Sequence, residues 1–186
     1  EFKRLTQRND LFTSASTSNT ERIIDVISVK KGQPTFIVDA KNVYFHAPET
    51  EQVFAEPPQC WLSWYRSQKD VDLVPDPVWV LDKTIYGRRE ASKRFNVYVT
   101  NLLKEKGFDQ CPAQPQMFKN FQTQVEMEVH QDDFHGTGPD DQSILDFCQS
   151  IKEKLLIKSS GPLKCGDKYK YLKCSRYRYS NGTLLV

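Results

Sequence analysis

The sequence predicts an α+β fold, because segments with helical spacing and segments with strand-like patterns follow one another in mixed order. The clearest helical signal is the apolar spacing of Phe95, Val99 and Leu102. The clearest strand signal lies at 125–129, where apolar and acidic residues alternate. With 186 residues, of which 38% are hydrophobic, the chain can bury a substantial core. We expect one large domain over residues 16–186 and a flexible N-terminal arm over residues 1–15.

The first half of the chain supplies one helix and several short strands. A capping-box pattern at 18–21 predicts a helix over about 20–30. The apolar run 35–38 predicts a buried strand that leads into Asp39, and 53–56 is a further short strand. Residues 59–77, rich in Pro, Asp and Trp, predict an irregular insertion, after which 78–81 is again strand-like.

The second half predicts two more helices with strands between and after them. A helix from Ala91 ends near Gly107, a residue typical of helix C-caps. Strands are expected at 117–119 and 125–129, followed by an amphipathic helix around Ile144. We expect the final stretch, 157–180, to be a hairpin region.

Composition and cysteine usage exclude some classes of protein. The chain has no apolar run near the ~18 residues needed to cross a bilayer, so membrane insertion is not expected. Its net charge of +2, from 26 basic and 24 acidic residues, gives only weak support for nucleic-acid binding. The five cysteines include no C-x-x-C pair, which argues against a zinc site and favours free thiols in a reducing intracellular compartment.

Asp39 and the Asp132-Asp133 pair are the strongest candidates for a catalytic role. An Asp-Asp pair in a tight turn between strands places two like charges close together, which is unfavourable unless a cation neutralises them. Enzymes that catalyse in-line phosphoryl transfer use carboxylates to hold two Mg²⁺ ions. A plain solvated turn is the alternative for the pair alone, because Asp favours turns.

Several segments, in the same order, resemble the reverse transcriptase of copia-type retrotransposons. These are residues 38–46, 53–58, 81–91, 106–118, 129–138 and 161–172. The resemblance implies a reverse-transcriptase-like palm, an antiparallel sheet with helices packed on one face. It also implies that the fingers are incomplete and that the thumb is absent.

The resemblance implies roles for particular residues. Asp39, Asp132 and Asp133 would bind two Mg²⁺ ions, or Mn²⁺, with the backbone carbonyl of Ala40 completing one ion's shell. Tyr44 would pack under the sugar of the incoming nucleotide. Lys83, Arg88 and Arg89 would contact phosphates. Tyr171 and Leu172 would lie in the region that grips the primer.

Two functions follow from the resemblance. The first is an RNA-directed DNA polymerase, or a fragment of one, whose partner is a nucleic acid primer–template. The alternative is a co-opted or degenerate palm that serves as a non-catalytic structural or binding subunit and binds protein partners. Glu90 favours the alternative, because the family has a neutral amide at this position and a carboxylate would repel a triphosphate.

Overall fold

A six-stranded antiparallel sheet forms the body of the protein in the computed structural model, which describes residues 18–68, 74–179 and 184–185. The strand order is β4-β5-β6-β7-β1-β8, so that strands distant in the sequence lie side by side. Its members are β1 (Thr35–Ala40), β4 (Asp109–Gln110), β5 (Met117–Lys119), β6 (Glu126–His130), β7 (Asp133–Thr137) and β8 (Ile157–Leu163). This arrangement confirms the α+β class. The predicted N-terminal arm, 1–15, lies outside the described residues.

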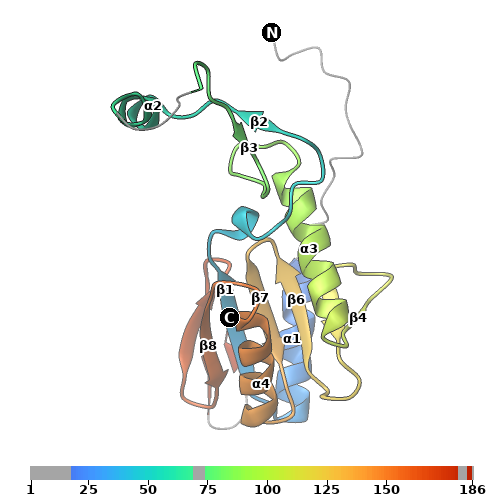
Figure 1. Ribbon diagram of the computed structural model, residues 1–186. Helices are drawn as coiled ribbons and strands as arrows, with labels where there is room; N and C mark the ends of the chain where they lie inside the picture. The colour runs from blue at the N-terminus through green and yellow to red at the C-terminus, as the bar shows by residue number, and fades with distance from the viewer. Residues whose placement is uncertain (1–17, 69–73, 180–183, 186) are drawn as a thin grey trace, which may run out of the picture.

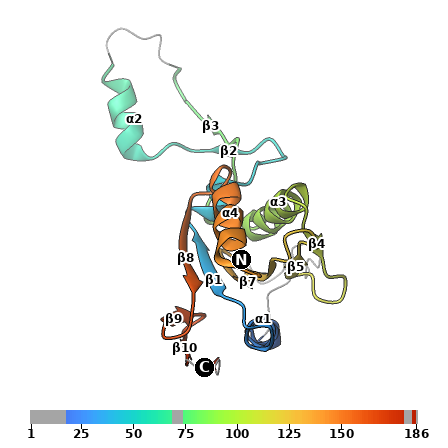
Figure 2. The same cartoon turned by 90° about the horizontal axis from the view of Figure 1, so that it is seen from below.

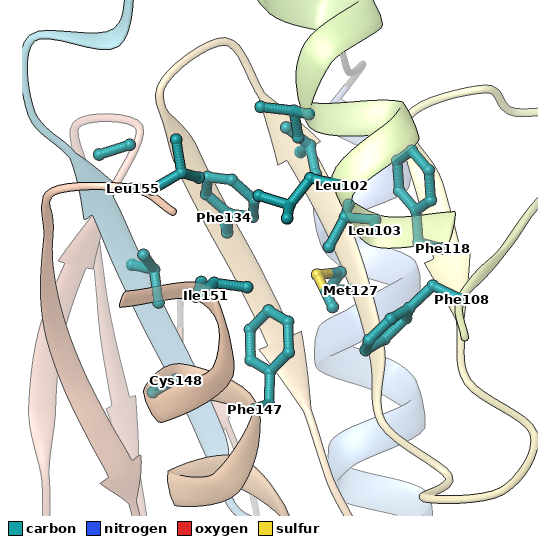
Figure 3. Packing of buried hydrophobic residues seen from close by; sticks show 14 of the residues in the cluster. Leu102, Leu103, Phe108, Phe118, Met127, Phe134, Phe147, Cys148, Ile151 and Leu155 are labelled. Atoms are coloured by element: carbon teal, nitrogen blue, oxygen red, sulfur yellow. The ribbon is translucent and has the colours of Figure 1, made fainter. Parts of the chain in front are cut away.

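Two helices cover one face of the sheet, α3 (Ala91–Glu105) and α4 (Asp141–Lys152). Their apolar faces meet alternate residues of the central strands, such as Met127 of β6 and Phe134 of β7, both fully buried (Figure 3). Burying a side chain of this size contributes roughly 1.5–3 kcal/mol. Both helices were predicted, and Gly107, with φ of +82°, follows α3 as expected.

A third helix and a second sheet cover the opposite face, so the expectation that helices pack on one face alone is wrong. Helix α1 (Ser18–Lys31) runs behind β6 and β7 in Figure 1. Beside it lies a three-stranded sheet of β9 (Lys168–Tyr171), β10 (Cys174–Arg178) and β11 (Leu184–Leu185) (Figure 2). The physical reason is that α1 has its own buried apolar residue, Ile24, and acidic residues that pair with Arg176 of β10.

An arm extends away from the body between β1 and α3 (Figures 1 and 2). It carries the two-stranded sheet of β2 (Phe54–Ala55) and β3 (Trp79–Val80) and the helix α2 (Gln59–Arg66). The prediction of irregular structure is therefore wrong for the part of 59–77 that forms α2. Trp61 and Tyr65, one helical turn apart, stack with ring centroids 4.8 Å apart, which stabilises this helix locally.

Candidate active site

Asp39 and Asp133 lie opposite each other at one end of the central sheet. Strand β1 pairs with β7 in a register that places Asp39 against Asp133, as expected from the sequence. The turn between β6 and β7 consists of Gln131 and Asp132, and Gln131 adopts a left-handed backbone conformation with φ of 55°. The backbone N–H of Ala40 donates to the Asp132 carbonyl across 2.8 Å. Backbone pairing thus brings the predicted acidic residues to one place.

The carboxylates at this end of the sheet repel one another. Burial raises the pKa of Asp133, and the negative charges of Asp132 and Asp39 raise it further. The ammonium group of Lys41 forms an ion pair with Asp39, and this hydrogen bond raises the pKa of Lys41. His130 and Lys41 both lower the pKa of Asp133, but they offset only part of the effect of burial and of the neighbouring negative charges.

The donor set suits a hard divalent cation, because ionised carboxylates are the ligands that Mg²⁺ prefers. Half-buried Asp132 and Asp133 lie in the turn and the strand that face Asp39. Within residues 18–68, 74–179 and 184–185, however, no group of three or more His, Cys, Asp or Glu side chains is gathered closely enough to hold a metal ion. Metal binding here would require these side chains to move closer together. It would also require the ion pair between Lys41 and Asp39 to break.

A cavity of about 240 Å³ opens beside Asp132 and brings it together with Tyr44. Tyr44 lies in a single-turn 3-10 helix, Val43–Phe45, directly after β1. Its ring packs against Tyr86, with centroids 4.7 Å apart, and against Phe95 of α3 at 6.4 Å. These contacts fix the tyrosine as one wall of the cavity, close to the acidic turn.

The predicted phosphate-binding side chains differ in their surroundings. Arg88 is engaged by Glu49, whose fully buried carboxylate lies 3.2 Å from the Arg88 guanidinium. Lys83 is exposed and donates to the backbone carbonyl of His46 across 3.3 Å. Arg89 is exposed. Of the three, Lys83 and Arg89 are the more accessible to an incoming anion.

Glu90 pairs with a neighbouring arginine. Its carboxylate lies 2.7 Å from the guanidinium of Arg94, one turn further along α3. Arg94 also pairs with Glu49 at 3.0 Å, so these residues form one network that includes Arg88. The negative charge expected at Glu90 is thus compensated within the protein, which weakens the argument that it repels a triphosphate.

Tyr171 and Leu172 lie at the turn between β9 and β10. Tyr171 ends β9 and is almost fully buried, whereas Leu172 occupies the turn with φ of 45°. The hydroxyl end of Tyr171 lies near Glu128 of β6, because these two groups influence each other's pKa. The β9–β10 turn therefore contacts the six-stranded sheet, which also carries the acidic turn between β6 and β7.

Sequence reasoning missed two features of this region. One is the pairing of Lys41 with Asp39, for which the two-residue spacing along β1 was the available signal. The other is the group of buried titratable side chains under the sheet, which includes Glu128 and His135. The alternation at 125–129 gave no sign of it, because alternating acidic residues normally face solvent.

A comparison with protein families identifies the family to which the chain belongs. The sequence pattern of the reverse transcriptase (RNA-dependent DNA polymerase) domain matches residues 6–173 of the 186. The chain belongs to the reverse transcriptase family. No curated protein matches it significantly.

The match spans every element of this reverse transcriptase domain from β1 to β9. It therefore includes the strands that bring Asp39 and Asp133 together, and the cavity beside Tyr44. None of the helices in the described parts of the chain has the length and apolar character that crossing a membrane requires.

Proposed function

We propose that this chain is the palm of an RNA-directed DNA polymerase of the copia type, and that it transfers nucleotides with the help of two Mg²⁺ ions. Asp39, Asp132 and Asp133 would hold the ions, with the carbonyl of Ala40 as a further ligand. The observation that carries the proposal is the register that sets Asp39 against Asp133, within a domain of this family. Mn²⁺ would serve in the same positions.

The bound ions would supply charge stabilisation for the attacking and leaving oxygens of the phosphoryl group. The chain's own residues have other tasks. Tyr44 and the acidic turn border one cavity, where the tyrosine ring would support the sugar of the incoming nucleotide. The exposed amino and guanidinium groups of Lys83 and Arg89 would contact phosphates, and such contacts supply affinity that does not depend on base sequence.

The primer–template would lie across the end of the sheet at which β1 and β7 carry their acidic residues. The turn at Tyr171 and Leu172 would support the primer end, since it is tied to the same sheet through Glu128. A support that contacts the sugar–phosphate backbone reads no sequence, as a polymerase requires.

A primer-extension assay tests the proposal. The purified chain is incubated with an RNA template, an annealed DNA primer, Mg²⁺ and all four deoxynucleotides. We expect extension that falls on the order of a thousandfold in Asp132→Asn, because several kcal/mol of charge stabilisation are lost. Asp141→Asn removes an acidic residue from the other Asp-Asp pair of the chain and is the matched control, expected to extend normally.

Two outcomes would contradict the proposal. One is equal extension by the wild type and Asp132→Asn, which would show that the activity does not come from this site. The other is no extension by the wild type under any condition in which it binds the primer–template, which would favour a non-catalytic binding subunit.

A further inference from the structure

A layer of buried titratable side chains lies between the six-stranded sheet and the elements on its second face. It consists of Glu21 and Asp25 of α1, Glu128 of β6, His135 of β7 and Arg176 of β10, which we call the ionic layer. Glu128, His135 and Arg176 have no exposed surface at all. Charges so deeply buried are tolerated only where each one is compensated.

The positive charges of this region are already matched without Glu128. Arg176 places one nitrogen 2.6 Å from Glu21 and another 2.9 Å from Asp25, so two carboxylates share a single guanidinium. Arg178, its neighbour on β10, donates to the backbone carbonyl of Ser28 across 3.0 Å and also to that of Gln33. Together, Arg176 of the layer and the adjacent Arg178 balance the charges of Glu21 and Asp25 without Glu128.

Glu128 is a third carboxylate with no cation of its own. The nearest basic atom is Nδ1 of His135, at 3.9 Å, and the other ring nitrogen of His135 faces Asp25 at 3.3 Å. The hydroxyl groups of Thr20 and Tyr171 lie beside the Glu128 carboxyl group. An ionised Glu128 would add an unbalanced negative charge, whereas a protonated one keeps the layer neutral and can donate a hydrogen bond.

The other titratable groups packed around this site do not change the balance of charge in the folded chain. Burial lowers the pKa of His135 to about 3, so its ring is neutral. Tyr169 and Tyr171 of β9 are buried and neutral, since burial raises the pKa of both. Asp133 of β7 adds negative charge toward Tyr171. Further along β6, Glu126 forms ion pairs with both Lys31 and Lys119, so these cations are already engaged.

We propose that Glu128 is a pH-sensitive latch: in its protonated form it holds α1 and the β9–β10 hairpin against the six-stranded sheet, and loss of its proton loosens both. The elements involved are the ones that contribute the ionic layer. Glu128 lies four residues before Asp132 in the sequence, and Tyr171 borders the turn of the hairpin. The latch therefore connects the acidic end of the sheet to that hairpin, whether or not the chain extends primers.

The direction of the effect follows from proton binding. Burial raises the pKa of Glu128 from its usual 4.5 to about 7 in the folded chain. A raised pKa means that the folded form holds a proton which the opened form releases. The stabilisation is complete below about pH 4.5, declines as the pH rises, and is gone above about pH 7. Glu128 therefore holds the hairpin least firmly near neutrality. His135, whose pKa burial lowers from 6.5 to about 3, acts in the opposite direction below about pH 6.5.

Hydrogen exchange of the full chain, followed by mass spectrometry between about pH 5 and pH 7.5, tests the latch. Glu128→Gln keeps the shape and removes the titration of this residue, so its opening should follow His135 alone and fall as the pH rises. After correction for intrinsic exchange rates, the ratio of wild-type opening to Glu128→Gln opening should rise on the order of tenfold from the lower pH to the higher, for amides of α1 and of residues 168–178. Glu126→Gln, on the same face of β6, is the matched control. It should keep the wild-type dependence on pH, although loss of its ion pair with Lys31 raises the opening of α1 at every pH.

The proposal is overturned if the wild type and Glu128→Gln show the same dependence of opening on pH. Should Glu128→Gln fail to fold, the carboxyl carbon of Glu128 can be followed by NMR in the wild type. A titration midpoint well above that of exposed glutamates supports the latch, and an ordinary midpoint contradicts it. Neither measurement depends on primer extension, so the latch and the polymerase function succeed or fail separately.

Discussion

The chain contains the dipeptide Asp-Asp twice, and the two pairs differ in what compensates their charge. In the pair Asp140-Asp141, Asp140 caps helix α4 and accepts a hydrogen bond from the Ser143 N–H across 2.8 Å, which lowers its pKa. Asp141 forms an ion pair with Lys164. In the pair Asp132-Asp133, burial and the neighbouring carboxylates raise the pKa of Asp133.

The difference shows why only one pair is suited to a metal. The helix-capping pair has each negative charge satisfied by a protein group, so a cation would gain little there. The pair in the β6–β7 turn faces Asp39 and is left with repulsion that the exposed Lys41 only partly relieves. Electrostatic strain of this kind is common at functional sites, because a ligand can relieve it.

Two glycines in the segment between the pairs, Gly136 and Gly138, offer the largest expected effect. At Gly136, in β7, an added Cβ would lie 2.3 Å from the Phe36 ring and 2.7 Å from the Glu126 carbonyl. Gly136→Ala should therefore lower the free energy of unfolding by roughly 3 kcal/mol. Gly138→Ala, nearer the capping pair, meets Ile144 at 3.0 Å and should cost roughly 1 kcal/mol. Urea unfolding measures both, and equal costs would contradict the close packing of Phe36 on β7.

The same substitution in the two pairs should change stability in opposite directions. Asp140→Ala removes a helix cap and should destabilise the protein by about 1 kcal/mol. Asp133→Ala removes a repelled charge and should stabilise it, by less than about 1 kcal/mol because the side chain is only half-buried. Urea unfolding in metal-free buffer measures both changes. If Asp133→Ala destabilised the protein as much as Asp140→Ala, the two pairs would not differ as described.

Much of the sheet and its first face could be predicted from the sequence. The spacing of Phe95, Val99 and Leu102 identified α3, and the apolar run before Asp39 identified β1. Local patterns of this kind are strong because one side of each element is uniformly apolar. The adjacency of Asp39 and Asp133 followed from the resemblance to reverse transcriptases, and the strand register agrees with it.

The second face of the sheet could not be predicted, because its interior is polar. Glu128 alternates with apolar neighbours as a solvent-facing residue would, yet it is fully buried under α1 and β9. Its burial depends on Arg176, which lies 48 positions away in the numbering and neutralises carboxylates from α1. Charge compensation between residues so far apart in the sequence leaves no periodic pattern in it. Helix α2 was missed for a different reason, since two prolines directly precede a helix of only eight residues.

Paramagnetic broadening by Mn²⁺ tests most directly the claim that Asp39, Asp132 and Asp133 form a metal site. In an NMR titration of the full chain, we expect amide signals of residues 39–41 and 131–134 to broaden first, and those of residues 140–142 to remain sharp. Asp132→Asn should abolish this broadening, whereas Asp141→Asn should not. Broadening centred on Asp140-Asp141, or broadening that persists in Asp132→Asn, would contradict the claim.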